Sequence, residues 1–360
     1  MKTSRILFTG GGTAGHVIVN LALIPVFRKE GWKIDYIGSE QGIERRLIES
    51  LDGVAYHAVS TGKLRRYLSK ENIKDPFKVL KGTFEAWRII GKRKPSVVFS
   101  KGGFVSVPVI VAAKLRGVPA VIHESDFTPG LANKLAMPFA EHVLSTFPET
   151  MDYLPEKKAE YVGAVIRNEL FEGDKTRGLS LCGFTNEKPV LMIMGGSGGS
   201  EKINQTVRES LGSLLSEFQI AHICGLNKVD SSLQHDGYAQ FEYVNDDLKD
   251  MFASADLVLS RAGANAIFEF LALQKPMLLV PLSRSASRGD QIINAHSFKE
   301  KNYANVLEEE ELTSESLVQA LMTLKKQAPV MIDHMKNYHS ERARSRVIEI
   351  IKEAAGVKTN

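Results

Sequence analysis

The chain has 360 residues, of which 43% are hydrophobic and 24% charged, and its formal net charge is +4 at pH 7. This composition is typical of a globular protein of two or three domains. Its two cysteines, Cys182 and Cys224, cannot supply a disulfide framework, so we expect packing to hold the fold and the compartment to be a reducing cytoplasm. No apolar stretch reaches the roughly 18 residues that span a bilayer, which argues against an integral membrane protein.

Short β-rich runs alternate with longer amphipathic stretches through the first half of the chain. This alternation predicts a parallel sheet with helices on both faces. The predicted strands are residues 5–9, 34–37, 54–59, 97–100, 119–123 and 142–146. The alternation then starts again, and the second series of predicted strands is residues 190–194, 219–224, 241–244, 257–260 and 277–280. The sequence therefore predicts two α/β domains in tandem, each doubly wound and Rossmann-like.

Three glycine-rich turns follow predicted strands, at residues 10–15, 102–103 and 195–199. Such a turn lets backbone approach a phosphate, and the helix after it presents unpaired N–H groups and a partial positive charge. The three turns together favour a diphosphate bound by the first domain and a second phosphate ligand bound by the other.

The glycine spacing and the basic residues each leave one other class of protein open. Gly10, Gly12 and Gly15 match the GxGxxG spacing of an NAD-dependent oxidoreductase. The basic residues of the segment 63–94 would suit a nucleic-acid protein that binds the phosphate backbone. A P-loop NTPase is excluded because no GxxxxGK[ST] motif is present, and we expect no metal site because the nine histidines do not cluster.

Six motifs spread over nearly the whole chain occur in the order seen in the MurG family of bacterial glycosyltransferases, which the sequence resembles. These motifs are Gly11-Gly12-Thr13-Ala14-Gly15-His16, Gly102-Gly103-Phe104-Val105-Ser106, His123-Glu124-Ser125-Asp126, Gly195-Gly196-Ser197, Arg261-Ala262-Gly263-Ala264 through Glu269, and Asp290-Gln291-Ile292-Ile293-Asn294-Ala295. Six ordered motifs are far more specific than one glycine turn.

The resemblance implies a GT-B fold, in which two Rossmann-like doubly wound parallel-sheet domains face each other across a cleft. Residues 1–163 would bind the lipid-linked acceptor and dock on the membrane, residues 164–341 would bind UDP-GlcNAc, and a helix at 342–360 would pack back on the first domain. The implied reaction is inverting transfer of GlcNAc from UDP-GlcNAc to the MurNAc 4-hydroxyl of undecaprenyl-pyrophosphoryl-MurNAc-pentapeptide (lipid I), which forms lipid II for peptidoglycan synthesis. It implies no cofactor, and a peripheral location on the cytoplasmic face of the bacterial cell membrane.

The resemblance also implies residue roles for the donor. Glu269 would accept hydrogen bonds from both ribose hydroxyls, and Ser197 with its glycine neighbours would bind the diphosphate. Arg167 would add a positive charge to the departing UDP, Val244 would read uracil through its backbone, and Gln291 would bind the GlcNAc hydroxyls. The remaining implied donor contacts are Thr13, Ala14, Gly15, Asp126 and Ala264.

On the acceptor side, the resemblance assigns the diphosphate to Gly11, Gly12, Gly102 and Gly103. Two residues compete as the group that deprotonates the 4-hydroxyl, His16 and Glu124. His16 could instead position the diphosphate or the sugar by a hydrogen bond or be purely structural, and Glu124 could instead shape its loop. An imidazole with an ordinary pKa near 6.5 suits a neutral base, and a helix N-terminus lowers that pKa further. The sequence departs from the family pattern at several positions: Ala14 replaces a glycine, Phe104 a tyrosine and Asp126 an asparagine. Val19-Asn20 stands where a proline is common, and Gly289-Asp290-Gln291 replaces Asp-His-Gln.

The segment Lys63 to Lys94 carries eleven basic and three acidic residues. On a helix from Pro76, one stripe would hold Lys74, Lys78, Lys81, Arg88 and Lys92, next to an apolar face of Phe77, Leu80, Phe84 and Trp87. This pattern is typical of an interfacial helix attracted to an anionic membrane, although the apolar face could equally be core.

Overall fold

The computed structural model describes residues 4–62, 70–196, 198–338 and 341–357. The chain divides into two compact units, which we call the N-terminal domain (Met1–Val165 with Ser340–Asn360) and the C-terminal domain (Ile166–His339). Within the described ranges, none of the helices combines the length and the apolar character that a membrane crossing requires.

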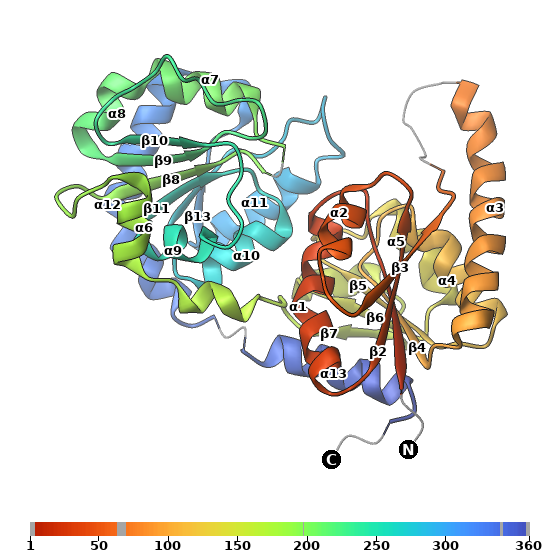
Figure 1. Ribbon diagram of the computed structural model, residues 1–360. Helices are drawn as coiled ribbons and strands as arrows, with labels where there is room; N and C mark the ends of the chain where they lie inside the picture. The colour runs from red at the N-terminus through yellow and green to blue at the C-terminus, as the bar shows by residue number, and fades with distance from the viewer. Residues whose placement is uncertain (1–3, 63–69, 197, 339–340, 358–360) are drawn as a thin grey trace. The chain divides into compact units, whose positions relative to one another are not determined.

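The N-terminal domain contains one sheet of seven parallel strands in the order β3-β2-β1-β4-β5-β6-β7 (Figure 1). Its strands are β1 (Arg5–Thr9), β2 (Lys33–Ser39), β3 (Val54–Val59), β4 (Val97–Ser100), β5 (Ala120–Glu124), β6 (His142–Ser145) and β7 (Ala159–Tyr161). Its α-helices are α1 (Gly15–Lys29), α2 (Ile43–Glu49), α3 (Lys70–Arg93), α4 (Ser106–Leu115), α5 (Leu131–Ala136) and α13 (Glu341–Ala354), with 3-10 turns η1 (Met137–Phe139) and η2 (Pro148–Tyr153).

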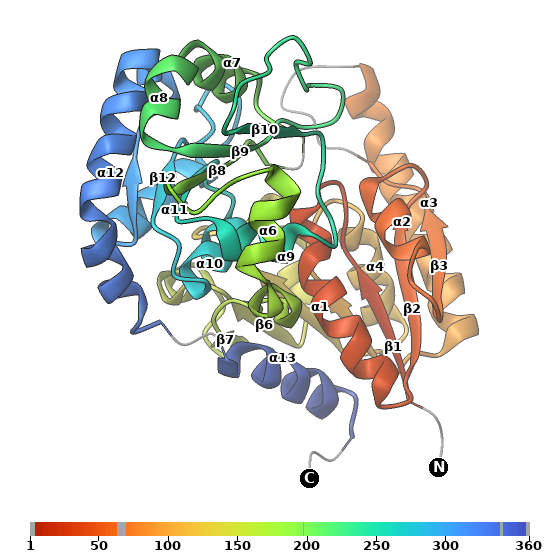
Figure 2. The ribbon, with the colours of Figure 1, turned by 60° about the vertical axis from the view of Figure 1, so that its left-hand side comes forward.

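Alternate residues of these strands point into two buried clusters, one on each face of the sheet. Phe8 and Phe99 pack with residues of α1, α2 and α13 on one face. Leu7 and Val98 pack with residues of α3 and α4 on the other. The last helix, α13, contributes buried Val347, Ile350 and Ile351 to the first cluster, and it lies beneath the N-terminal domain in Figure 2. A helix from the end of the chain therefore completes the core of the first domain.

The C-terminal domain contains six parallel strands in the order β10-β9-β8-β11-β12-β13. Its strands are β8 (Val190–Met194), β9 (Gln219–Ile223), β10 (Tyr238–Phe241), β11 (Leu257–Ser260), β12 (Met277–Leu279) and β13 (Ala304–Val306). Its α-helices are α6 (Lys175–Cys182), α7 (Glu201–Glu209), α8 (Leu211–Glu217), α9 (Leu248–Ser254), α10 (Ala264–Ala272), α11 (Asp290–Glu300) and α12 (Ser314–Met335), with 3-10 turns η3 (Asn168–Glu172) and η4 (Glu309–Glu311).

The two sheets confirm the predicted pair of Rossmann-like α/β domains. In each of them, the first strand of the domain lies in the middle, between the second and the fourth. The order in which successive strands are added to the sheet reverses there. Ligands of doubly wound folds bind beyond the carboxyl ends of the strands at this switch point. The loops after β1 and β4, and after β8 and β11, are therefore the places to look for a site.

Candidate functional site

Two glycine loops meet at the switch point of the N-terminal domain. The loop after β1 and the loop after β4 are joined by a hydrogen bond from the Gly11 N–H to the Gly102 carbonyl, with N and O 3.3 Å apart. A Cβ on Gly103 would lie only 2.2 Å from the Gly11 oxygen, and the φ of Gly103 is +83°. Only glycine fits at position 103, because a side chain would both strain the backbone and collide with the neighbouring loop.

The backbone N–H groups of these loops are largely engaged within the protein. The Gly12 N–H donates to the Glu44 carboxylate at 3.0 Å, and the Gly102 N–H donates to the Ser100 hydroxyl at 3.2 Å. Sequence reasoning missed Glu44, whose buried carboxylate also accepts hydrogen bonds from Ser39. The structure thus brings the four predicted acceptor glycines together, and their binding of a diphosphate stays a prediction.

His16 lies in the first turn of α1, where its ring contacts the first glycine loop. Its Nδ1 is 2.9 Å from the Gly11 carbonyl oxygen and 3.2 Å from the Thr13 hydroxyl. Because a carbonyl only accepts hydrogen bonds, Nδ1 carries the proton and the lone pair of the neutral ring lies on Nε2. Burial lowers the pKa of His16, and the positive charge of Lys101 lowers it further. This arrangement produces a neutral imidazole with Nε2 ready to accept a proton.

Glu124, the other predicted base, has both carboxylate oxygens occupied. One accepts from the N–H groups of Ser125 at 2.8 Å and Asp126 at 3.0 Å. The other accepts from the Gly130 N–H at 2.9 Å and from the Asn133 amide at 2.8 Å. A carboxylate held by four donors shapes the loop that follows β5, and it is poorly placed to take a proton from a substrate.

The replacement of a family glycine by Ala14 causes no backbone strain. Ala14 has φ −59° and ψ −33°, which are right-handed helical angles that alanine adopts freely. Together with Thr13 and Gly15 it forms the turn that leads into α1. The other predicted donor contact of this domain, Asp126, lies in the loop after β5, close enough for its charge to raise the pKa of His16.

In the C-terminal domain, the glycine loop after β8 runs into the N-terminus of α7. The Ser200 hydroxyl caps this helix by accepting from the Ile203 N–H at 3.4 Å. A Cβ on Gly199 would lie 1.9 Å from the Cys224 carbonyl oxygen, so only glycine lets the loop pass so close to the end of β9. Ser197 lies outside the described residues, and its predicted contact with the diphosphate stays a prediction.

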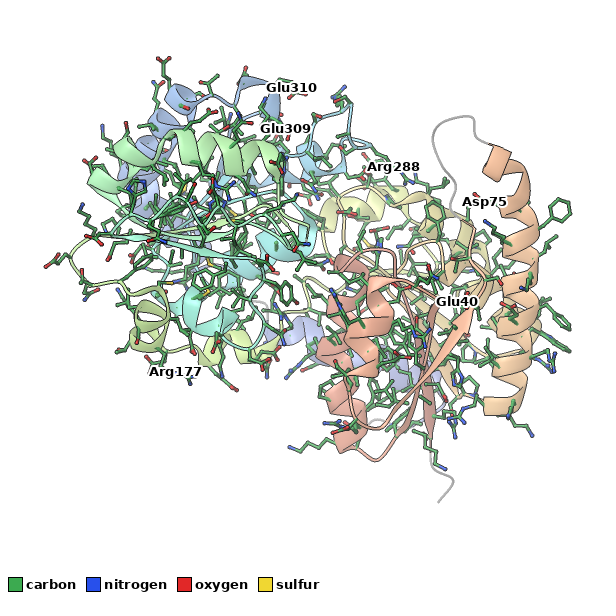
Figure 3. All side chains as sticks on the ribbon, turned by 45° about the horizontal axis from the view of Figure 1, so that its top comes forward. Glu40, Asp75, Arg177, Arg288, Glu309 and Glu310 are labelled. Carbon is green, nitrogen blue, oxygen red and sulfur yellow. The ribbon has the colours of Figure 1, made fainter. Side chains whose placement is uncertain are left out.

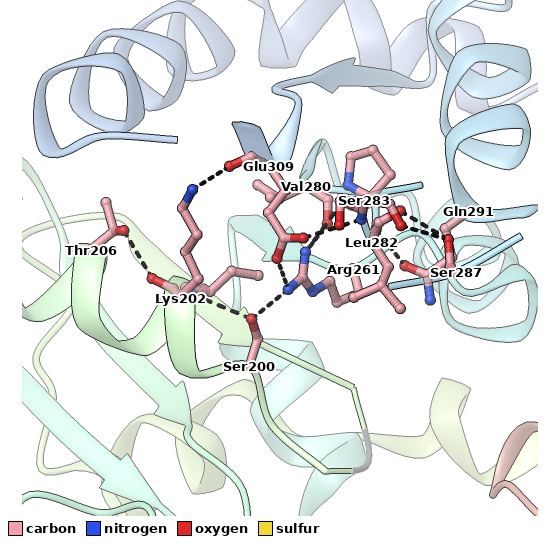
Figure 4. Close-up of polar contacts among 12 residues, drawn as sticks. Ser200, Lys202, Thr206, Arg261, Val280, Leu282, Ser283, Ser287, Gln291 and Glu309 are labelled. Atoms are coloured by element: carbon pink, nitrogen blue, oxygen red, sulfur yellow. Dashed lines mark hydrogen bonds and ion pairs between the residues drawn. The ribbon is translucent and has the colours of Figure 1, made fainter. Parts of the chain in front are cut away.

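Arg261, directly after β11, ties this loop to the segment between β12 and α11 (Figure 4). Its guanidinium donates to the Ser200 hydroxyl at 2.7 Å and pairs with the Glu309 carboxylate. Glu309 in turn accepts from the Ser283 N–H at 3.1 Å. Sequence reasoning missed Glu309 because it lies in a run of four glutamates that looks like an ordinary solvated surface.

Gln291, on α11, lies at the far end of this network (Figure 4). Its side-chain oxygen accepts from the Leu282 N–H at 3.1 Å. Arg261 and Glu309 therefore tie the glycine loop that ends at Ser200 to the segment that contains Ser283. Gln291 binds the same segment at Leu282.

Glu269 is buried on α10 and forms an ion pair with Arg167, with Nε and Oε1 3.1 Å apart. Burial raises the pKa of Glu269, and the positive charge of Arg167 opposes that rise. The sequence assigned these two residues separate roles, and the structure brings them into contact although 102 positions separate them. The predicted contact Ala264 begins the same helix.

Val244 lies in the loop before α9, not at the end of a strand as predicted, because β10 ends at Phe241. The neighbouring Tyr243 is near enough to Arg167 to influence its pKa. This loop therefore lies close to the Arg167–Glu269 pair, and the contact of Val244 with uracil stays a prediction.

Two family models match the chain, the glycosyltransferase family 28 N-terminal domain over residues 6–145 and the family 28 C-terminal domain over residues 190–352. Among solved structures, the crystal structure of Acinetobacter baumannii MurG is similar, with 25% identity, a TM-score of 0.77 and coverage of 98% of this chain and 99% of that one. The glycosyltransferase of kitacinnamycin shares the fold, with a TM-score of 0.73 at 16% identity and coverage of 98% of this chain and 100% of that one.

Curated relatives named UDP-N-acetylglucosamine–N-acetylmuramyl-(pentapeptide) pyrophosphoryl-undecaprenol N-acetylglucosamine transferase are also similar. The one from Oceanobacillus iheyensis is 72% identical, covering 97% of this chain and 98% of its own length. The one from Geobacillus thermodenitrificans is 62% identical, covering 89% of this chain and 90% of its own length. The chain therefore belongs to the MurG family within glycosyltransferase family 28.

Proposed function

We propose that this protein transfers GlcNAc from UDP-GlcNAc to the MurNAc 4-hydroxyl of lipid I and so forms lipid II. The observation that carries this proposal is the 72% identity, over nearly the full chain, to a relative named for this transfer. It favours a glycosyltransferase over the NAD-dependent oxidoreductase and the nucleic-acid protein that the glycines and the basic segment left open.

We assign the donor to the C-terminal domain. Glu269 would accept hydrogen bonds from the two ribose hydroxyls, and Arg167 would hold this carboxylate in place and supply positive charge to the leaving UDP. The glycine loop before α7 would bind the diphosphate, because the N-terminus of that helix favours an anion. Gln291 would hydrogen-bond the GlcNAc hydroxyls, and Val244 would contact uracil. Stabilising negative charge on UDP as it departs is the largest contribution such a site can make to the rate.

We assign the general base to His16 and a shaping role to Glu124. The support is that Nε2 of the neutral His16 ring bears a lone pair, whereas both oxygens of Glu124 already accept hydrogen bonds. The reaction would be a single displacement with inversion at the sugar. Nε2 would take the proton of the 4-hydroxyl while its oxygen attacks the anomeric carbon and UDP leaves from the opposite face.

We assign membrane docking to α3, since the proposed acceptor is carried on a lipid. The helix packs on the domain through small residues and one isoleucine, namely Gly82, Ala86 and Ile90. Phe77, Leu80 and Phe84 are 72%, 67% and 58% exposed. Side chains extend outward from α3 in Figure 3, where Asp75 marks its N-terminal part. Most of the predicted apolar face is therefore surface, and its exposed basic neighbours Lys78, Lys81 and Arg88 would attract an anionic, cytoplasmic membrane face.

A turnover assay tests the proposed reaction. Purified protein is mixed with labelled UDP-GlcNAc and lipid I, and the product is separated by its lipid anchor. We expect label in lipid II, no transfer without lipid I, and a large loss of rate in the His16→Gln variant. A folded protein that leaves lipid I unglycosylated, but is stabilised against heat by NADH or by an oligonucleotide, would refute the proposal.

A further inference from the structure

His222 is a fully buried histidine of β9 that the proposed mechanism does not use. Its Nε2 lies 3.0 Å from the Asn204 side-chain oxygen, and its Nδ1 lies 3.0 Å from the Tyr238 hydroxyl oxygen. Asn204, on α7, is also buried, and its side-chain nitrogen donates to the Cys224 carbonyl at 2.8 Å. These four residues, which we call the His222 network, link the start of β10 through β9 and α7 to the loop after β9.

The Cys224 carbonyl fixes the direction of every hydrogen bond in the His222 network. Because a carbonyl only accepts, Asn204 turns its NH₂ group toward Cys224 and its side-chain oxygen toward His222. Nε2 of His222 therefore carries the proton, and Nδ1 accepts from the Tyr238 hydroxyl. Burial, and to a lesser extent the positive charge of Arg208, lowers the pKa of His222 to about 3, so the ring is neutral at cytoplasmic pH. Reversing any of these bonds would leave a buried polar group unpaired.

The His222 network ends at the glycine loop that precedes α7. Gly199 of this loop packs so closely against the Cys224 carbonyl oxygen that a side chain would collide with it. Asn204 is also tied to the end of the loop, since its backbone N–H donates to the Ser200 carbonyl at 2.9 Å. The Asn204 residue therefore contacts both the loop and the carbonyl against which the loop packs, so the position of that carbonyl determines the path of the loop.

We infer that His222 is a positioning residue for the donor diphosphate. Its Nε2–H holds the Asn204 amide in the orientation that anchors the Cys224 carbonyl, and this carbonyl supports the glycine loop before α7. The inference rests on the proposed function, because that function places the diphosphate of UDP-GlcNAc on this loop. A loop that has its shape before the donor binds loses less free energy to ordering, so its contacts contribute more to diphosphate affinity.

The first test separates the diphosphate from the rest of the donor by comparing UDP with uridine. Calorimetry gives the dissociation constants of both, and the ratio of uridine to UDP measures what the diphosphate adds. In His222→Leu, which fills similar space without an N–H, this ratio should fall by about tenfold, because the network loses buried hydrogen bonds. Uridine affinity should stay at the wild-type value, since other residues are assigned to the ribose and the uracil.

Two further variants show whether a lost hydrogen bond or lost stability is responsible. His222→Gln has an N–H near the position of Nε2 and still donates to Asn204, so most of the wild-type ratio should return. Leu324→Ala removes a buried side chain of α12 outside the network, and it should lower the melting temperature without changing the ratio. A merely structural role of His222 predicts instead a ratio that follows the melting temperature in all three variants.

The second test needs neither a ligand nor a variant. NMR of the isotope-labelled protein gives the tautomer of His222 from the chemical shifts of its two ring nitrogens. We expect the proton on Nε2 and no titration of this ring between about pH 5 and 8. A proton on Nδ1 would reverse the hydrogen bonds of the network and overturn the inference, even if the donor binds as proposed. This measurement decides the matter if His222→Leu does not fold.

The binding results also distinguish this inference from the proposed function. If the wild-type protein binds UDP no more tightly than uridine, the assignment of the diphosphate to the glycine loop fails, and the inference fails with it. If the wild type prefers UDP and folded His222→Leu keeps the same ratio, only the inference fails. It also fails if His222→Gln or Leu324→Ala loses as much of the ratio as His222→Leu does.

Discussion

The proposed docking surface on α3 makes a quantitative prediction about membrane binding. Replacing Phe77, Leu80 and Phe84 by serine removes apolar side chains that are 72%, 67% and 58% exposed. Burying one such side chain fully contributes about 1.5 to 3 kcal/mol, so inserting the exposed part of each contributes about 1 to 2 kcal/mol. The three together should contribute at least about 3 kcal/mol, which corresponds to a loss of about 100-fold in vesicle affinity.

The charged part of the surface should behave differently. Replacing Lys78, Lys81 and Arg88 by glutamine removes about 1 kcal/mol each near an anionic surface, again about 100-fold in total. Their contacts within the protein are weak, such as the 3.6 Å ion pairs of Lys78 with Asp75 and of Lys81 with Glu85. This loss should disappear at high salt, whereas the loss in the serine variant should persist.

Co-sedimentation with anionic and with zwitterionic vesicles, at low and at high salt, measures both effects. Because the substituted side chains are exposed, each substitution should change the free energy of unfolding by no more than about 0.5 kcal/mol. The control is Val330→Ser on α12, an apolar residue that is 61% exposed in the other domain. If the folded serine variant sediments with vesicles as well as the wild type does, α3 is not the docking surface and its exposed apolar residues need another explanation.

Three further predictions concern the two sites. Glu269→Ala should weaken UDP binding by about 100-fold, because it removes charge-assisted hydrogen bonds worth about 3 kcal/mol. It should also lower the melting temperature, because it breaks a buried ion pair. Unchanged UDP affinity in calorimetry would remove the ribose assignment. Gly103→Ala should reduce turnover at least tenfold more than Gly12→Ala, because both positions have positive φ (+83° and +87°) but only the first Cβ collides with a neighbour. Equal rates would mean that contact between the loops is unimportant. Burial raises the pKa of Glu309, but the hydrogen bonds from Arg261 and Ser283 and the positive charge of Arg261 together outweigh burial and lower it below 4.5. The contribution of these contacts to stability is therefore complete above about pH 4.5 and falls as the pH drops through the lower pKa of the folded protein. Glu309→Gln should therefore lower the melting temperature at neutral pH and much less near pH 3; an equal loss at both would exclude the ion pair as the cause.

Most strands were predictable because a parallel strand buried on both faces is a short apolar run between polar stretches. The prediction missed β7 (Ala159–Tyr161) and β13 (Ala304–Val306), which are three-residue strands at the sheet edges. An edge strand pairs on one side only and is partly exposed, so it needs no apolar run. The predicted strand at 241–244 was displaced for a similar reason, since β10 (Tyr238–Phe241) is the other edge of its sheet.

The position of α3 shows where a sequence pattern stops being informative. Its apolar residues could have been core, and the sequence alone left that open. The structure decides it at Gly82, where an added Cβ would lie 2.1 Å from the Ser60 carbonyl oxygen. Because the close approach to the domain is made by the smallest residue of the helix, the aromatic residues are left on the other side.

The residues that sequence reasoning missed share one property, which is that they act over long separations in the chain. Glu44 reaches the Gly12 N–H across 32 positions, and Glu309 reaches Arg261 across 48. Neither carboxylate belongs to a recognisable motif, since each lies among ordinary charged residues of a helix or turn. A glycine motif identifies the loop, but only the folded chain shows which group holds that loop in place.

These carboxylates also change how the glycine loops should be understood. A phosphate-binding loop is usually pictured as a set of free N–H groups, yet the N–H groups of Gly11, Gly12 and Gly102 already have partners within the protein. Their acceptors hold the loops in one conformation before any ligand arrives. In a reaction that depends mainly on alignment, such a preformed site loses little free energy to reorganisation when the substrate binds. We therefore expect attraction of the acceptor diphosphate to come from the N-terminus of α1 and from the buried charge of Lys101, with the glycines supplying the shape.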